Sequence, residues 1–171
     1  MLAEDTIDWY AQDVSGNVWY FGEDTKELNE FGHVISTEGT WKAGVNGAQP
    51  GIVMEADPKV GDRYHQELAP GVAEDQAEVL SLDASTCVPY GCFDHLLLTK
   101  EWTVLKPGVV EQKYYAGGIG FISGAAVQGG NEHTELAKAG VVPEPCSFVL
   151  LASGFLGFAV HRKRRPVAIK F

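Results

Sequence analysis

Short segments in which apolar and polar residues alternate constrain the fold of this chain more than any other feature. Residues 6–12 and 18–21 are both rich in aromatic and β-branched side chains, and a turn-forming stretch at 13–17 separates them. Gly16 and Asn17 tolerate the positive φ angles of tight turns. Together these segments predict a β-hairpin near the start of the chain.

The same pattern continues to residue 122. Further strands are predicted over residues 32–43, 52–54, 62–68, 73–80, 93–104 and 109–122, with clusters of turn-forming residues between them. Residues 73–80 also suit a helix by propensity, but their alternation and their strand neighbours favour a strand. Strands about ten residues apart, without amphipathic helices, are typical of antiparallel all-β domains. We expect residues 1–122 to form an antiparallel meander curved into a barrel or half-barrel, with a sandwich as the second choice.

From residue 123 the composition shifts to Gly, Ala, Asn, Glu and Lys. This shift predicts a flexible linker over residues 123–141, with a weak helix at 132–139. A sorting segment over 142–165 and a short tail over 166–171 complete the expected organisation of the chain.

The charge of the chain is divided unevenly. Residues 1–141 carry 22 acidic and 8 basic side chains, whereas residues 142–171 carry one Glu and five Lys or Arg. Nucleic acid is therefore excluded as a partner of the body, because phosphate contacts need Lys and Arg. An acidic surface confers solubility and attracts cations or basic partners.

The C-terminal segment combines three features in a fixed order. A Pro-containing motif comes first, then a charge-free apolar run over 146–160, then a basic cluster. The motif consists of Val142, Pro143, Glu144 and Pro145, and the cluster of Arg162, Lys163, Arg164 and Arg165. Fifteen residues make a helix of roughly 22 Å, shorter than the ~30 Å hydrocarbon core. Such a short transmembrane helix would keep its basic cluster in the cytoplasm and the β domain outside; a buried core helix is the alternative.

This segment resembles the PEP-CTERM sorting signal of Gram-negative bacteria. The resemblance implies that exosortase, a membrane enzyme, recognises the motif and cuts the chain near residues 143–146. The protein would then be exported, held in the inner membrane before processing, and delivered to the envelope or the extracellular matrix. An exopolysaccharide is a further candidate partner there. The tail over 166–171 extends beyond the basic cluster, where the family's signal usually ends.

Residues 8–23, 50–67, 89–103 and 110–116 are similar to a family of uncharacterised secreted or lipoprotein-like bacterial domains. That likeness implies export and an all-β fold, and it transfers no catalytic residue. Residues 1–6 contain neither a basic nor an apolar leader, although an exported protein needs one. We therefore expect that earlier residues are missing from this sequence.

Two cysteines, Cys87 and Cys92, flank four residues that include Pro and Gly. This spacing suits a hairpin loop, across which a disulfide can form if the two strand ends face each other. Two unpaired thiols are the alternative. Cys146 begins the apolar run, where it acts as a small apolar residue or as a lipidation or thiol site.

Aromatic residues are the best candidates for a binding site in the body. If Trp9, Trp19 and Tyr115 line a concave face, they can bind a sugar ring or an apolar ligand. The alternative is that they fill the core and form cross-strand pairs.

Catalytic and metal-binding patterns are not evident. Glu23 and Asp24, like Glu74, Asp75 and Glu78, read as a solvated acidic face, since nothing in the sequence places two of these carboxylates in one cleft. The turn at 13–17 lacks the terminal Glu of a calcium loop, and the histidines are isolated.

We expect a non-enzymatic exported protein without cofactor or metal. A carrier of a small apolar ligand or glycan is the alternative, and a glycan-processing enzyme is the third possibility.

Overall fold

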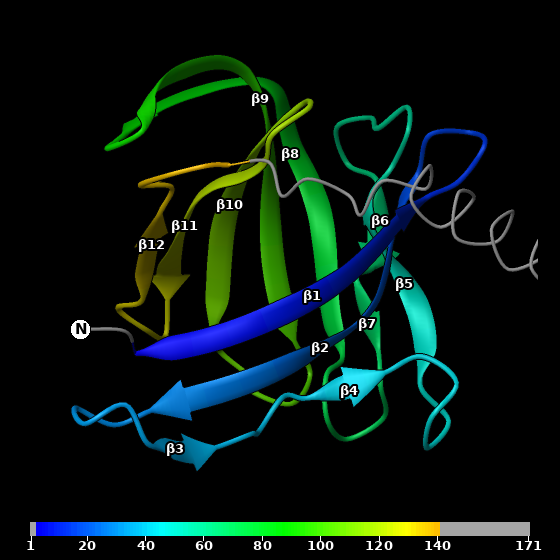
Figure 1. Ribbon diagram of the computed structural model, residues 1–171. Helices are drawn as coiled ribbons and strands as arrows, with labels where there is room; N and C mark the ends of the chain where they lie inside the picture. The colour runs from blue at the N-terminus through cyan, green and yellow to red at the C-terminus, as the bar shows by residue number, and fades with distance from the viewer. Residues whose placement is uncertain (1–2, 141–171) are drawn as a thin grey trace, which may run out of the picture. The chain divides into compact units, whose positions relative to one another are not determined.

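The computed structural model describes residues 3–140, which form strands and turns and no helix (Figure 1). The strands are β1 (Glu4–Gln12), β2 (Val18–Leu28), β3 (Val34–Ser36), β4 (Trp41–Lys42), β5 (Gln49–Met54), β6 (Arg63–His65), β7 (Glu67–Leu68), β8 (Asp75–Val88), β9 (Gly91–Thr103), β10 (Val110–Ala116), β11 (Gly120–Gln128) and β12 (His133–Glu135). All pairings between them are antiparallel, so the predicted fold class is confirmed. Within residues 3–140 there is no helix of a length and apolarity that would span a membrane.

The first sheet has the order β1-β2-β5-β7, with β3 and β4 pairing along β2. The predicted hairpin joins β1, at one edge of this sheet, to β2, and Gln12 pairs with Val18 across its turn. Asp13 holds that turn together, because its carboxylate accepts hydrogen bonds from the backbone N–H groups of Ser15 and Asn17. Hydrogen bonds of this kind are the reason that Asp favours such turns.

The second sheet has the order β12-β11-β10-β9-β8-β6. From β8 to β12 it is a meander, since each strand pairs with the next one in the sequence. The long β8–β9 hairpin carries a disulfide between Cys87 and Cys92, which pair directly across its end. In Figure 1, β1 and β2 run across the strands of this sheet rather than along them.

The chain passes from one sheet to the other at Gln66. Strand β6 pairs with β8 in the second sheet, and β7, one residue later, pairs with β5 in the first. Gly51 of β5 lies so close to this crossing that a Cβ atom there would be 2.2 Å from the carbonyl oxygen of Gln66. The crossing therefore needs glycine at this position.

The two sheets do not close into a barrel. Closure requires every strand to pair on both sides, but β1 and β12 each pair with a single strand. The expectation of a closed barrel is thus wrong, and two facing sheets with a space between them take its place.

Buried apolar side chains form three small clusters rather than one core. One lies around Tyr20 and Trp41, a second around Val79, Leu97 and Tyr115, and a third around Leu96 and Ile122. Many of their other members are alanines. Apolar side chains therefore do not fill the region between the sheets.

The structure differs from the sequence prediction after residue 116. Residues 119–122 do not extend the preceding strand, because the chain reverses at Gly118 and returns as β11. Strand β11 continues to Gln128, and β12 occupies residues 133–135, so the predicted linker begins with sheet structure and the predicted weak helix begins with a strand. Glycine suits position 124 of β11 because a Cβ atom there would lie only 3.2 Å from the Lys113 side chain, so there is little room on that face. The predicted C-terminal helix and sorting signal lie outside the described residues.

Candidate functional site

The space between the two sheets holds two adjoining cavities of about 580 and 520 Å³. They share the side chains of Asp8, Tyr10, Val53, Tyr115 and Phe121, so they form one continuous cleft. We call the larger cavity the apolar chamber and the smaller one the acidic chamber. Pockets of several hundred Å³ that combine apolar walls with a few polar groups are typical of small-molecule sites.

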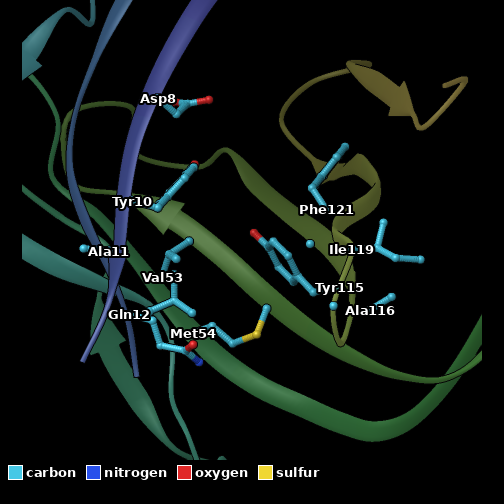
Figure 2. A pocket seen from close by; sticks show the side chains of 13 residues that line it. Asp8, Tyr10, Ala11, Gln12, Val53, Met54, Tyr115, Ala116, Ile119 and Phe121 are labelled. Carbon is cyan, nitrogen blue, oxygen red and sulfur yellow. The ribbon is translucent and has the colours of Figure 1, made fainter. Parts of the chain in front are cut away.

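The apolar chamber lies between the first strand and the β10–β11 hairpin (Figure 2). Tyr10 on one wall faces Tyr115 and Phe121 on the other, and Met54 lies along the lower side of the view. Tyr115 and Phe121 meet edge to face, with their ring centroids 6.0 Å apart. This chamber presents aromatic and aliphatic surface to an occupant.

The alternation of β1 determines which of its side chains reach the cleft. Thr6, Asp8 and Tyr10 line the acidic chamber, whereas Ile7 and Trp9 between them line neither chamber. This is the period of two that a strand imposes. The predicted binding residue Trp9 is therefore on the face opposite the cleft.

Three aromatic rings connect β1 with the acidic chamber. Tyr10 stacks on Tyr20 at 4.7 Å, and Tyr20 meets Trp41 edge to face at 5.4 Å. The Tyr20 hydroxyl donates a hydrogen bond to Asp8, and the Trp41 indole N–H donates one to Glu67. These contacts fix the orientation of two carboxylates that line the cleft.

The acidic chamber is lined by seven carboxylates and one lysine: Glu4, Asp8, Glu23, Glu67, Asp75, Glu101, Glu111 and Lys113. Five of them also line a third cavity of about 280 Å³, namely Glu23, Glu67, Asp75, Glu101 and Glu111. The negative charge is therefore concentrated in the interior of the cleft and not only on the outer surface.

Glu101 and Lys113 form the one ion pair that is buried in this chamber among the described residues. Glu101 is only 3% exposed, and its Oε2 atom lies 2.9 Å from the Lys113 ammonium. Its Oε1 atom accepts hydrogen bonds from Gln66, Thr99 and Tyr115. Burial raises the pKa of the Glu101 carboxyl, but Lys113 and these donors outweigh it and hold the pKa below its usual range.

Glu67 is in the opposite situation, because no cation pairs with it among residues 3–140. Burial raises the pKa of its carboxyl to about 8, and the nearby charges of Asp75 and Glu23 add to the shift. Burial likewise raises the pKa values of the Glu23 and Asp75 carboxyls. At neutral pH the Glu67 carboxyl is therefore largely protonated.

The predicted aromatic site is not assembled as expected. Tyr115 lines both chambers and is 8% exposed. Trp9 instead lines a separate hollow of about 300 Å³, where the Lys42 ammonium lies 5.4 Å from the centre of its ring. Trp19 donates a hydrogen bond to Asp13 and so stabilises the β1–β2 turn. The structure therefore does not bring the three residues to one face.

The acidic residues also differ from expectation. Glu23 and Asp75 were interpreted as part of a solvated face, but both line the cleft. Glu78 instead pairs with Arg63, with 3.0 Å between charged atoms. The carboxylate of Asp13 is occupied by hydrogen bonds from Trp19 and Asn17, which lower its pKa to about 2. Within residues 3–140 no three His, Cys, Asp or Glu side chains converge in a way that could hold a metal ion.

Sequence reasoning missed most residues of the cleft, among them Tyr10, Glu67, Glu101 and Lys113. Glu101 and Lys113 carried a usable signal, because both interrupt predicted strands with a charge that alternation directs to the same face as Thr99 and Tyr115. That these polar side chains face inward could have been recognised only with the strand register known. The sorting residues from Val142 to Pro145 and the basic cluster lie outside the described residues.

Comparisons with protein-family models, with curated proteins and with solved structures found no match. The function therefore has to be inferred from the residues of the cleft.

Proposed function

We propose that this protein is an exported, non-enzymatic β domain that binds a small ligand with apolar and polar parts in the cleft between its sheets. The observation that carries the proposal is the cleft itself, which joins the apolar and acidic chambers at the centre of the domain. A folded domain of this size normally fills its centre with apolar side chains at crystal-like density. Here the three apolar clusters leave the centre to two cavities.

The lining of the cleft supports binding more than catalysis. Aromatic rings such as Tyr10 and Tyr115 offer flat apolar surface, and the acidic chamber offers hydrogen-bond acceptors. Glu101 is saturated by its hydrogen bonds and by Lys113, so it holds the site together and does not act as a base. A sugar ring or a compact aromatic molecule fits the size and the chemistry of the two chambers.

A binding experiment with a blocked cleft tests this proposal. Ala11 is exposed and lines the apolar chamber, so Ala11→Trp should obstruct it with little effect on the core. We expect cellobiose, 2-phenylethanol or 2-phenylethylamine to bind the native protein in calorimetry, and the variant to bind at least about tenfold more weakly, a loss of about 1.4 kcal/mol. Ala137→Trp, in an exposed position away from both chambers, is the matched control and should bind as the native protein does.

Two results would count against the proposal. One is that none of the three compounds binds, and the other is that Ala11→Trp binds them as tightly as the control. A melting curve for each variant shows whether the fold is retained. If Ala11→Trp fails to fold, Val53→Phe, which narrows the passage between the two chambers, takes its place.

Export and sorting form the second part of the proposal. The disulfide between Cys87 and Cys92 supports it, because disulfides persist in oxidising compartments outside the cytoplasm. The PEP-CTERM-like segment would deliver the domain to the envelope or matrix after cleavage by exosortase, where an exopolysaccharide is a candidate partner. Mass spectrometry of the mature protein from a host with exosortase should find the basic cluster removed. A mature protein that still carries Arg162–Arg165 would contradict the sorting proposal.

A further inference from the structure

The acidic chamber has an excess of hydrogen-bond acceptors and negative charge. Lys113 is the only cation among its lining residues, and it is paired with Glu101 and Glu111 at 2.9 and 3.3 Å. The other five carboxylates have no cationic partner among residues 3–140. They accept hydrogen bonds from neutral side chains instead, as Asp8 does from Tyr20 and Glu67 from Trp41.

Gln66 gives a second and independent indication. It is 4% exposed and lines the acidic chamber. Its amide nitrogen donates to Glu101, which fixes which end of the amide is the oxygen. No side-chain donor within residues 3–140 bonds to that oxygen, and the oxygen is not fully buried, so it stays open to the chamber. An occupant of the chamber that donates hydrogen bonds would satisfy it.

We infer that the ligand is an amphipathic organic amine, whose ammonium group lies in the acidic chamber and whose apolar body lies in the apolar chamber. This inference rests on the proposed function and specifies its ligand class. An ammonium group carries three donors and a positive charge, so it matches the Gln66 oxygen and the unpaired carboxylates of Glu67 and Asp75. Its apolar body would contact Tyr115, Phe121 and Met54, which line the other chamber.

The passage between the two chambers also favours a cation. Tyr10 and Tyr115 both line the passage, and the faces of aromatic rings attract ammonium groups. Asp8 lies at the same place, so negative charge continues from the passage into the acidic chamber. A carboxylate ligand would meet repulsion along this whole path, and a neutral alcohol would leave the charge uncompensated.

Three probes that share one aromatic body separate the possibilities: 2-phenylethylamine, 2-phenylethanol and 3-phenylpropanoate. Calorimetry on the native protein at low ionic strength should show that the amine binds at least about tenfold more tightly than the alcohol, and that the carboxylate does not bind. The preference should diminish in high salt, because salt screens the charges that cause it. Cellobiose serves as the neutral sugar.

The variant Glu67→Gln tests which carboxylate recognises the ammonium group. It keeps the shape of the side chain and an acceptor for Trp41, and in calorimetry above pH 8, where the Glu67 carboxyl is ionised, it removes the charge. We expect the preference for the amine over the alcohol to fall at least about threefold, with the affinity for the alcohol nearly unchanged. Glu38→Gln, which removes an exposed carboxylate away from both chambers, is the control and should keep the full preference.

The outcomes separate the inference from the proposed function. If the alcohol or cellobiose binds in the cleft as tightly as the amine, or if Glu67→Gln keeps the full preference, the amine inference is overturned and the binding function stands. If no probe binds, or if Ala11→Trp binds all of them normally, both are overturned.

Discussion

At the scale of single residues, the cleft depends on one buried ion pair. Glu101 receives three neutral hydrogen bonds and the Lys113 ammonium, and it is 3% exposed. Such a pair adds little net stability, but removal of one partner leaves the other charge in a poorly solvated place. Glu101 thus positions Gln66 and Tyr115, which both line the cleft.

We predict that Glu101→Gln destabilises the protein by about 2 kcal/mol. This figure is below the usual cost of breaking a buried pair, because Lys113 keeps Glu111 as a partner and is partly exposed. Chemical denaturation of the native protein and the variant measures the difference. Glu38→Gln should change the free energy of unfolding by less than about 0.5 kcal/mol. An equal effect of both substitutions would show that the ion pair has no structural role.

Glu67 makes stability depend on pH. Its pKa is about 8 in the folded protein and near 4.5 in the unfolded chain, so between these values the folded state holds a proton that the unfolded state releases. The stabilisation of the folded state by the proton on Glu67 is fully present below pH 4.5, and it disappears as the pH rises through 8.

We therefore predict that the free energy of unfolding of the native protein falls as the pH rises from 4.5 to 8. Relative to Glu67→Gln, the decrease should be on the order of 2 kcal/mol, after allowance for solvent screening. Denaturation curves at several pH values for both proteins provide the measurement. Parallel pH profiles for the two proteins would contradict the assigned pKa.

The residues of the site were harder to predict than the strands that carry them. A glutamate within an alternating segment gives no indication of whether its face is solvated, so Glu23 and Asp75 were placed on the surface. Trp9 and Tyr10 are adjacent, and only the register of β1 decides which of them faces the cleft. The register shift between Trp9 and Tyr10 adds to this difficulty, because a bulge changes the phase of the alternation.

At the scale of elements, the crossing between the sheets at Gln66 depends on Gly51. A side chain at Gly51 would meet the backbone of His65 and Gln66, which cannot move without disturbing β6 and β7. Strand β5 also contributes Val53 and Met54 to the cleft. The close contact therefore positions one wall of the ligand site.

We predict that Gly51→Ala destabilises the protein by about 2–4 kcal/mol, within the range of other substitutions that force a side chain into packed atoms. Gly117→Ala is the matched control, since no heavy atom lies within 4 Å of the position of its Cβ and its φ is not in the positive region. Thermal and chemical denaturation measure both variants. If Gly51→Ala and Gly117→Ala are equally stable, the backbone at Gln66 moves away from the new side chain more easily than its hydrogen bonds suggest.

Strands with strong turn signals were predictable from the sequence. The β1–β2 hairpin follows from its aromatic residues and from the Asp13–Asn17 turn. The first part of strand β8 followed from alternation over residues 73–80 despite its helical propensity, but its extension to Val88 was not predicted. The region after Tyr115 was less predictable, because Gly and Ala are common both in linkers and in strands whose neighbours lie close. At Gly124 of β11 a Cβ atom would lie 3.2 Å from side-chain atoms of both Lys113 and Phe121, and such close approaches are not visible in composition.

At the scale of the whole molecule, the open centre makes stability depend on the ligand. A compound that binds only the folded state raises the free energy of unfolding by about 2.7 kcal/mol at a concentration of 100 times its Kd. We predict an increase of this size with the tightest-binding probe, measured by chemical denaturation. The Ala11→Trp variant should show a much smaller increase at the same concentration, and an equal increase would place the binding site elsewhere.

The strand order of the second sheet has a consequence for how the domain folds. From β8 to β12 every strand pairs with its neighbour in sequence, so each contact closes a short loop. The first sheet must instead pair β2 with β5 across residues 29–48. Contacts that are distant in sequence form more slowly, because a longer loop loses more entropy when it closes. We expect the meander to form early and to serve as the template on which β1, β2 and β5 assemble, so that the cleft is the last part of the domain to take shape.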